Sequence, residues 1–322
     1  MVLVLGIDAG GTSTRAVLAT VDGERVGTGG AGGGNPIAHG APAAAAQIRT
    51  AVRQALGDAD PATVAGGVLG LAGRGALADP ANAALFARMW ADLGLGRAPR
   101  PEADPLVAYC SATPAPAGSV LLSGTGAAAL RIEGLRVTRV ADGHGWLLGD
   151  EGSAFWLGRA AAKVAVRQIL AGEAGPLARL VIDRLAGPGA PATQDTADAI
   201  STAVQGAPVR TLAPLAPLVS VAAGAGDPVA ASIVDEAADR LVATAAKVRD
   251  PDDRGPIVLA GGVLTAVGPL RARVEHRCAT RWAAPVRVAT DGAAGAAWLA
   301  ACEFAALTGP RASAVHRRLI GG

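Results

Sequence analysis

The chain has 322 residues, enough for two domains that each bury a core. Its 29 basic and 27 acidic residues nearly cancel, so the net charge gives no support for binding to nucleic acid or to a membrane surface. Apolar residues make up 51%, but no long run is free of charges and glycines and the first residues carry no basic segment, so we expect a cytoplasmic protein with neither a spanning helix nor a secretory signal.

The first third of the chain predicts strands followed by alternating helices and strands. A near-continuous apolar run at residues 2–7 ends in the turn Asp8-Ala9-Gly10-Gly11, which is typical of a buried strand entering a tight turn. The pattern predicts further strands at 14–20, 25–28 and 64–72, and helices at 43–56 and 81–93. These elements indicate a mixed sheet covered by helices.

The same opening pattern recurs after a segment rich in proline and small residues at 113–118. Here an apolar strand at 120–122 is followed by the turn Ser123-Gly124-Thr125-Gly126 and by strands at 127–132 and 135–140. The repeat indicates an α/β protein with two similar domains, 1–113 and 114–322, built around a shared cleft.

The rest of the chain is predicted to be mainly helical. Expected helices lie at 153–170, 176–185, 212–223, 228–248 and 292–307, with buried strands at 257–260 and 286–289. The basic tail from Gly309 is expected to fray, although the last helix or tail can pack back on the N-terminal domain.

The two glycine turns are the strongest functional signal. A glycine turn lets backbone N–H groups approach phosphate oxygens, and hydroxyl side chains add donors. The candidate phosphate ligands are Gly10, Gly11, Thr12 and Ser13 in the first turn and Gly124, Thr125 and Gly126 in the second. One such turn alone is better explained as an ordinary hairpin, but two in equivalent places favour a phosphate site. Neither matches the P-loop, because no Gly-Lys-Ser/Thr follows, and neither matches the dinucleotide-binding fingerprint, because each turn opens a strand rather than a helix.

Two carboxylates beside these motifs are candidates for the chemistry. Asp8, at the end of the first strand, either holds Mg²⁺ or merely shapes the turn. Asp104 precedes Pro105 and a helical stretch, so it can cap that helix, accept a proton from an attacking hydroxyl, or do both.

Three other polar or glycine-rich segments allow a structural and a functional interpretation. Asp150, within Gly149-Asp150-Glu151-Gly152-Ser153, either compensates a helix terminus or binds sugar hydroxyls. Asn35 is either an ordinary loop residue or a ligand of the substrate. Gly261 and Gly262 form a strand-to-helix turn or a surface for adenosine.

The three cysteines, Cys110, Cys278 and Cys302, have no neighbours at metal-binding spacing. We expect buried thiols in a reducing compartment rather than a zinc or disulfide framework.

Four segments of the chain resemble motifs of one family, in the family's order. They are Asp8-Ala9-Gly10-Gly11-Thr12-Ser13-Thr14-Arg15, Ser123-Gly124-Thr125-Gly126, Leu148-Gly149-Asp150-Glu151-Gly152-Ser153 and Leu259-Ala260-Gly261-Gly262-Val263. They look like the BadF/BadG-type ATPase family and, within it, the N-acetylglucosamine kinase branch of the actin/hexokinase superfamily.

The resemblance implies two ribonuclease-H-like domains with ATP and Mg²⁺ in the cleft, and a homodimer. By it, the two glycine turns bind the phosphates and Gly261-Gly262 lies by the adenosine. Asp104 corresponds to the catalytic base, Asn35 and Asp150 correspond to sugar-binding positions, and His144 and Gly145 lie in the stretch that helps to form the sugar pocket.

The chain departs from the family pattern at two places. The first motif often has lysine where this chain has Ser13, and N-acetylglucosamine kinases often have Trp-Gly where this chain has His144-Gly145. The resemblance implies a kinase acting on O6 of N-acetylglucosamine, and because the second departure lies in the stretch that helps to form the sugar pocket, glucosamine or another amino sugar stays open as the acceptor.

Two other functions remain as alternatives. One is the ATPase that activates a radical dehydratase or reductase, which needs cysteines clustered for an iron–sulfur cluster. The other is a non-catalytic sugar sensor. Sensors on this fold carry an added DNA-binding module. We expect no such module at the N-terminus, because the predicted phosphate-binding strand starts at residue 2.

Overall fold

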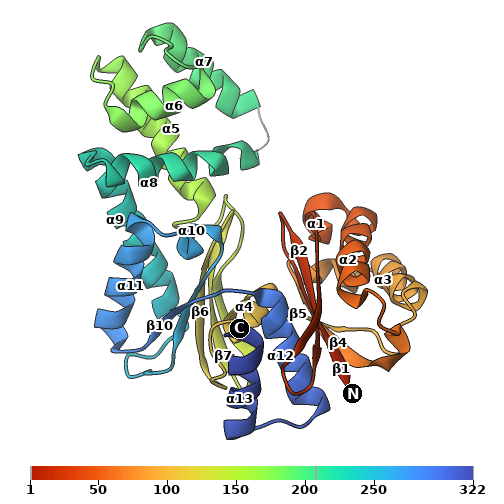
Figure 1. Cartoon of the computed structure of the whole chain (residues 1–322). Coiled ribbons are helices and arrows are strands. Elements are labelled where there is room, and N and C mark those ends of the chain that lie inside the picture. Colours follow the sequence, from red (N-terminus) through yellow and green to blue (C-terminus); the bar gives the residue numbers. More distant parts are fainter. Residues whose placement is uncertain (1, 207–208, 322) are drawn as a thin grey trace. The chain divides into compact units, whose positions relative to one another are not determined.

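The computed structural model describes residues 2–206 and 209–321 as an α/β chain with two five-stranded sheets (Figure 1). The chain divides into two compact units. Unit 1 comprises Met1–Pro116, Gly134–Val137 and Ala289–Gly322, and unit 2 comprises Ala117–Glu133 and Thr138–Val288. The C-terminal segment, blue in Figure 1, thus belongs with the N-terminal sheet, in red.

The sheet of unit 1 has the strand order β3-β2-β1-β4-β5. Its strands are β1 (Leu3–Ala9), β2 (Thr14–Thr20), β3 (Arg25–Ala31), β4 (Val64–Leu71) and β5 (Arg100–Glu102). The first three form an antiparallel meander, and β4 and β5 continue the sheet parallel to β1. The central strand β1 therefore ends, at Asp8 and Ala9, beside the first glycine turn.

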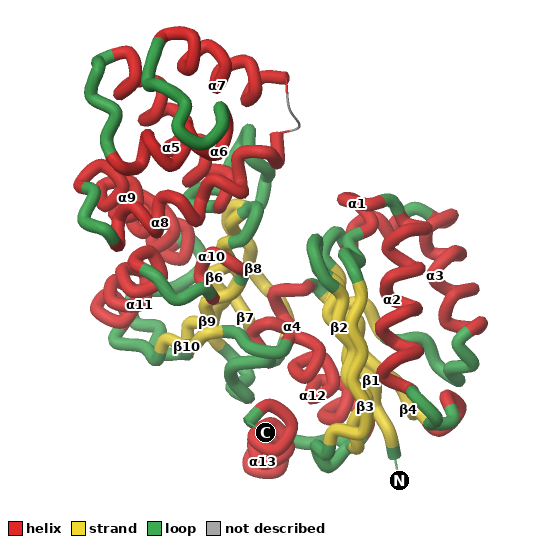
Figure 2. Tube along the Cα trace, turned by 45° about the horizontal axis from the view of Figure 1, so that its top comes forward, coloured by secondary structure: helices red, strands yellow, loops and turns green. Residues whose placement is uncertain are grey.

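Helices cover both faces of this sheet, as Figure 2 shows. They are α2 (Ala41–Leu56) and α3 (Pro80–Asp92) on one face and α12 (Gly292–Phe304) on the other. Leu3, Leu5 and Ile7 point toward α2 and α3, as the alternation of a strand requires. On the opposite face Gly6 lets α12 approach so closely that any added Cβ would overlap the helix backbone.

Unit 1 also contains two short α-helices, two 3₁₀ turns and a final helix. They are α1 (Pro36–His39), α4 (Asp104–Cys110), η1 (Pro61–Thr63), η2 (Arg74–Ala78) and α13 (Gly309–Ile320). The expectation that the tail frays is wrong, because it forms α13. Its buried side chains Ala312, Val315, His316 and Leu319 recur at helical spacing, and His316 donates a 2.8 Å hydrogen bond from Nε2 to the carbonyl oxygen of Cys110.

The sheet of unit 2 has the order β10-β9-β6-β7-β8 and repeats the opening of unit 1. Its strands are β6 (Gly118–Ser123), β7 (Ala127–Glu133), β8 (Arg136–Asp142), β9 (Ile257–Ala260) and β10 (Val286–Val288). Strands β6 and β7 are antiparallel around the second glycine turn, and β9 pairs parallel to β6.

Eight helical segments complete the described part of unit 2. They are α5 (Ala154–Leu170), α6 (Pro176–Leu185), α7 (Gln194–Gly206), η3 (Val209–Leu215), α8 (Ala216–Gly224), α9 (Pro228–Ala246), α10 (Gly262–Thr265) and α11 (Pro269–Trp282). The helix expected at 212–223 begins as the 3₁₀ turn η3, which contains Pro214, and only then becomes α8. Helices α7 and α11 were not predicted.

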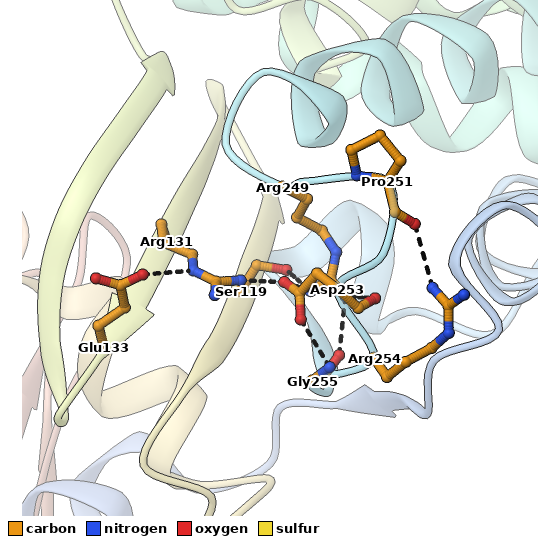
Figure 3. A network of polar contacts seen from close by, with 8 residues as sticks. All are labelled: Ser119, Arg131, Glu133, Arg249, Pro251, Asp253, Arg254 and Gly255. Atoms are coloured by element: carbon orange, nitrogen blue, oxygen red, sulfur yellow. Dashed lines mark hydrogen bonds and ion pairs between the residues drawn. The ribbon is translucent and has the colours of Figure 1, made fainter.

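A buried ion network fixes the loop between α9 and β9 (Figure 3). Arg249, whose side chain is fully buried, donates to Ser119 Oγ at 2.7 Å and to the carbonyl oxygens of Asp253 and Gly255 at 3.0 and 2.9 Å. The Asp253 carboxylate pairs with Arg249 at 3.3 Å and also with Arg131. Because an unpaired buried charge is costly, these contacts hold the loop to β6 and β7.

Within residues 2–206 and 209–321, no single helix is long and apolar enough to cross a membrane. Thr211–Gly224 and Pro228–Ala246 pass that test of length and composition only as a pair, with a bend of 118°.

Candidate functional site

The first glycine turn joins β1 to β2 and is open toward solvent. The N–H of Gly10 donates to the carbonyl oxygen of Ser13 at 2.9 Å, which closes the turn. Gly11, Thr12 and Ser13 are exposed, and nothing lies within 4 Å of a Cβ added to Gly11. The turn therefore leaves backbone and hydroxyl donors free to meet an anion.

The loop that carries Asn35 lies directly beside this turn. The N–H of Gly34 donates to the carbonyl oxygen of Gly10 at 2.9 Å. Asn35 is the N-cap of α1, and its Oδ1 accepts hydrogen bonds from the N–H groups of Ile37 and Ala38 at 2.9 and 3.1 Å. With Oδ1 occupied in this way, the amide NH₂ is the part of Asn35 left to bind a substrate, as a donor.

His39 connects the two segments and was not predicted from the sequence. Its Nε2 lies 2.7 Å from the carbonyl oxygen of Gly11, and since a carbonyl only accepts, Nε2 must donate. The last residue of α1 thus supports the first glycine turn. A histidine shortly after an Asn-Pro pair was the only local signal.

Asp8 and Asp104 are the acidic pair of unit 1, and both are half-buried. Asp104 is the first residue of α4; its N-cap is Ala103, so the alternative that Asp104 caps the helix is wrong. Burial raises the pKa of Asp8 to about 7, the nearby carboxylates of Asp104 and Asp291 add to the rise, and the Arg15 guanidinium opposes it. Burial also raises the pKa of Asp104 to about 6.

The N-terminus of α12 closes over Asp8. A Cβ on Gly292 would overlap the Asp8 carboxylate, so only glycine fits there. The preceding residue, Asp291, caps α12 by accepting from the N–H of Ala294 at 3.2 Å and pairs with Arg25 at 2.9 Å. Asp8 is therefore confined on one side by the N-terminus of α12.

Over the described part of the chain, no cluster of three or more His, Cys, Asp or Glu side chains could hold a metal ion on its own. Mg²⁺ in phosphoryl-transfer enzymes, however, is held by one or two carboxylates, water and the substrate's phosphates. Burial and the neighbouring carboxylates raise the pKa of Asp8 more than Arg15 lowers it, and a cation at this place would further stabilise the ionised carboxylate. The residues present fit a magnesium ion that arrives with a nucleotide.

In unit 2, the second glycine turn lies against the Gly261-Gly262 segment. The N–H of Gly124 donates to the carbonyl oxygen of Gly126 at 2.8 Å, and Thr125 is exposed. A Cβ on Gly261, whose φ is 82°, would overlap the carbonyl oxygen of Ser123. Glycine is thus required for the close approach of these two segments.

Asp150 lies against the same turn. Its Oδ1 accepts a hydrogen bond from the N–H of Ala127 at 3.0 Å, and a Cβ on Gly126 would come within 2.8 Å of that oxygen. Burial raises the pKa of Asp150; the bond from Ala127 opposes the rise, the Asp142 carboxylate adds to it and His144 lowers it. His144 is exposed on the loop before Asp150.

The rest of the Gly-Asp-Glu-Gly-Ser segment has structural roles. Ser153 is the N-cap of α5 and accepts from the N–H of Trp156 at 3.1 Å, as the capping interpretation expects. Glu151 pairs with Arg240 of α9. This leaves Asp150 as the residue of the segment available to a ligand.

The structure therefore collects the predicted residues into two groups, one in each unit. The group of unit 1 is Asp8, Gly10, Gly11, Thr12, Ser13, Asn35 and Asp104. The group of unit 2 is Gly124, Thr125, Gly126, His144, Gly145, Asp150, Gly261 and Gly262. Cys110 and Cys278 are buried and Cys302 is half-buried, and burial raises the pKa of Cys278 to about 12.

Comparison with known proteins defines the class. The chain belongs to the BadF/BadG/BcrA/BcrD ATPase family, whose model matches residues 5–300. None of the curated proteins with which the sequence was compared matches it.

Solved structures agree with the fold. A candidate N-acetylglucosamine kinase from Chromobacterium violaceum is 28% identical, with a TM-score of 0.72, and the match covers 93% of this chain and 99% of that one. A second candidate of that kind, from Porphyromonas gingivalis, is 21% identical with a TM-score of 0.68 over 95% and 100%. A ROK family glucokinase from Streptomyces griseus is 22% identical with a TM-score of 0.55 over 92% and 99%. The prediction of an α/β chain with two ribonuclease-H-like, actin/hexokinase-type domains is confirmed.

Proposed function

We propose that this protein transfers the γ-phosphoryl group of ATP to a hydroxyl of an amino sugar, first of all O6 of N-acetylglucosamine. Glucosamine is the alternative acceptor. The observation that carries the proposal is the pair Asp8 and Asp104 beside an open glycine turn, with pKa values of about 7 and 6. The likeness to the Chromobacterium violaceum protein supports the choice of sugar.

Asp104 is the proposed general base. With a pKa of about 6 it is mainly ionised at neutral pH and still basic enough to accept the proton of an attacking hydroxyl. Its place in the first turn of α4, a short helix packed on α12 and β4, gives the carboxylate a fixed position. The sugar would be oriented by the Asn35 amide as donor and by Asp150 as acceptor, with His144 and Gly145 beside it.

The two glycine turns are proposed to bind the phosphates of one ATP, and Gly261-Gly262 its adenosine. Backbone N–H groups and the hydroxyls of Thr12 and Thr125 would donate to oxygens whose charge grows during transfer. Asp8 would hold Mg²⁺, which when bound supplies positive charge to the β- and γ-phosphates. The protein is further proposed to act in the cytoplasm as a homodimer.

The proposal is tested by ADP release from Mg-ATP with N-acetylglucosamine, glucosamine, N-acetylmannosamine and glucose as acceptors. We expect release that depends on sugar, the highest kcat/KM with N-acetylglucosamine, and a product whose phosphorus couples to the C6 protons by NMR. Highest activity with glucosamine would change the acceptor but keep the reaction.

Two other outcomes would overturn the proposal. ADP release that is unaffected by every sugar indicates an ATPase, and iron in the purified protein would then favour the activator of a radical enzyme. Sugar binding without ADP release would favour a sensor.

A further inference from the structure

The loop from Asp142 to Asp150 is held in a strained conformation. Asp142 has a φ of 65° and Asp150 a φ of 58°, both in the left-handed region that residues other than glycine rarely adopt. Gly143 and Gly145, within the same loop, also have positive φ. Strain of this kind persists only where surrounding contacts enforce it, and such places are often functional.

The contacts that enforce it come from one carboxylate. Oδ1 of Asp142 accepts hydrogen bonds from the N–H groups of Gly143 at 2.8 Å and Asp150 at 2.7 Å, and Oδ2 accepts from Glu151 at 3.0 Å. A Cβ on Gly149 would overlap Oδ1, so the chain closes tightly over this group. Asp142 therefore joins the two ends of the loop, and hydrogen bonds to a charged acceptor are the stronger kind.

These contacts also fix Asp150 at two points. Its backbone N–H is held by Asp142, and its side-chain Oδ1 is held by the N–H of Ala127, directly after the second glycine turn. Oδ2 of Asp150 accepts no hydrogen bond from the described residues, so it is the oxygen left to accept from a ligand. With its backbone and its Oδ1 held, Asp150 has a fixed orientation and offers Oδ2 as an acceptor.

We propose that Asp142 is a positioning residue for sugar binding: it locks the loop so that Asp150 offers Oδ2 to a hydroxyl of the acceptor. The inference rests on the proposed function, and it adds a residue of the chain that does not itself touch the substrate. It predicts that the loss of Asp142 weakens sugar binding far more than ATP binding.

The test compares Asp142→Asn with Asp142→Gly, because both residues tolerate a left-handed φ and so keep backbone strain out of the comparison. Asparagine retains one acceptor oxygen, whereas glycine retains none. We expect the sugar KM to rise about 3-fold in Asp142→Asn and about 10-fold in Asp142→Gly, with the ATP KM changed less than about 2-fold.

A matched control is Asp227→Asn. The Asp227 carboxylate also accepts three backbone N–H groups, from Leu177 at 2.8 Å, Val229 at 2.8 Å and Ala230 at 3.1 Å, and it lies in the same unit. Asp227→Asn should lower the melting temperature at least as much as Asp142→Asn and leave the sugar KM unchanged. Equal effects of the two variants on the sugar KM would reduce Asp142 to a stabilising residue and overturn the proposal.

Amide hydrogen exchange separates this inference from the proposed function. In Asp142→Gly the amides of Asp150 and Glu151 should exchange at least 10-fold faster than in the wild type, whether or not a sugar is phosphorylated. Suppose that the amides exchange faster in Asp142→Gly but the wild type has no kinase activity. This result would reject the proposed function and the role of Asp142 in sugar binding, and it would keep the conclusion that Asp142 holds the loop. Unchanged exchange together with an unchanged sugar KM would reject the positioning role in an active kinase.

Discussion

At the scale of single residues, the acidic pair of unit 1 allows a direct test of the base. Asp104→Asn keeps the size of the side chain but removes its basicity, and general-base catalysis is typically worth about 10²–10⁴-fold. We expect kcat to fall by about that factor while the sugar KM stays within about 2-fold. In the wild type, kcat/KM should fall as the pH drops through about 7 and about 6, because Asp8 and then Asp104 become protonated. Near-normal turnover in the variant, or a flat pH profile from 5 to 8, would remove Asp104 from this role.

Asp8 makes a second residue-scale prediction, on stability. Its pKa is about 7 in the folded protein against 3.8 for an ordinary aspartate, so between these values the folded state binds more protons than the unfolded state. Stability then decreases as the pH rises toward 7, and the full cost is present above it. Asp8→Asn removes this cost, so without nucleotide its melting temperature should exceed the wild-type value at pH 8 by about 2–4 °C. The gain should vanish below pH 4.

A lower melting temperature for Asp8→Asn at pH 8 would show that Asp8 stabilises the fold and would weaken its assignment to a cation. The stability cost that Asp8 imposes is understandable if the ionised carboxylate is kept for a ligand, because functional groups are often retained at the expense of stability.

At the scale of elements, the packing of α12 on β1 depends on Gly6. A Cβ there would overlap the backbone of Ala293 and Ala297, so Gly6→Ala must push the helix away from the strand that ends at Asp8. Overpacking of this kind costs about 1–3 kcal/mol. We expect chemical denaturation to show that loss, together with a change in the pKa of Asp8.

Gly30→Ala is the control in the same sheet. Nothing lies within 4 Å of a Cβ at Gly30, and its φ is not positive. The free energy of unfolding of this variant should therefore lie within about 0.5 kcal/mol of the wild-type value. A Gly6→Ala variant as stable as Gly30→Ala would contradict the close packing of α12 on β1.

The elements predicted well from the sequence are those whose signal is local. Strands β1 and β6 are apolar runs ending in glycine turns, and both were found with small shifts at their ends. Helix α13 was missed because its apolar positions are few and its partner, the Cys110 carbonyl, is distant in the chain. Tertiary packing, which a single sequence does not show, decides such cases.

The candidate site divides in the same way. The two glycine turns lie where the sequence predicts them, because each is a pattern of consecutive residues, and their role in binding phosphate stays a prediction. His39 and Asp142 were not predicted, since each acts through backbone groups elsewhere: His39 on Gly11, and Asp142 on Asp150 and Glu151. A backbone carbonyl or N–H has no sequence signature, so residues that hold a loop in place are seen only in the structure.

At the scale of the whole molecule, each unit repeats the same strand, glycine turn, strand unit and carries half of the predicted ligands. The turn of unit 1 has acidic neighbours and the turn of unit 2 has the Gly261-Gly262 segment. The proposed function has both turns bind the phosphates of one ATP.

Substitution of one threonine in each turn tests that proposal. Thr12→Val and Thr125→Val each remove one exposed hydroxyl and keep the branched shape, and a hydrogen bond to a phosphate is worth about 1 kcal/mol or more. Each should raise the ATP KM about 5-fold and leave the sugar KM nearly unchanged. The matched controls are Thr28→Val on β3 and Thr138→Val on β8, which replace exposed threonines outside the two turns. They should change neither the ATP KM nor the sugar KM. If only one of the two turn variants raises the ATP KM, the proposal that both turns bind one nucleotide is contradicted.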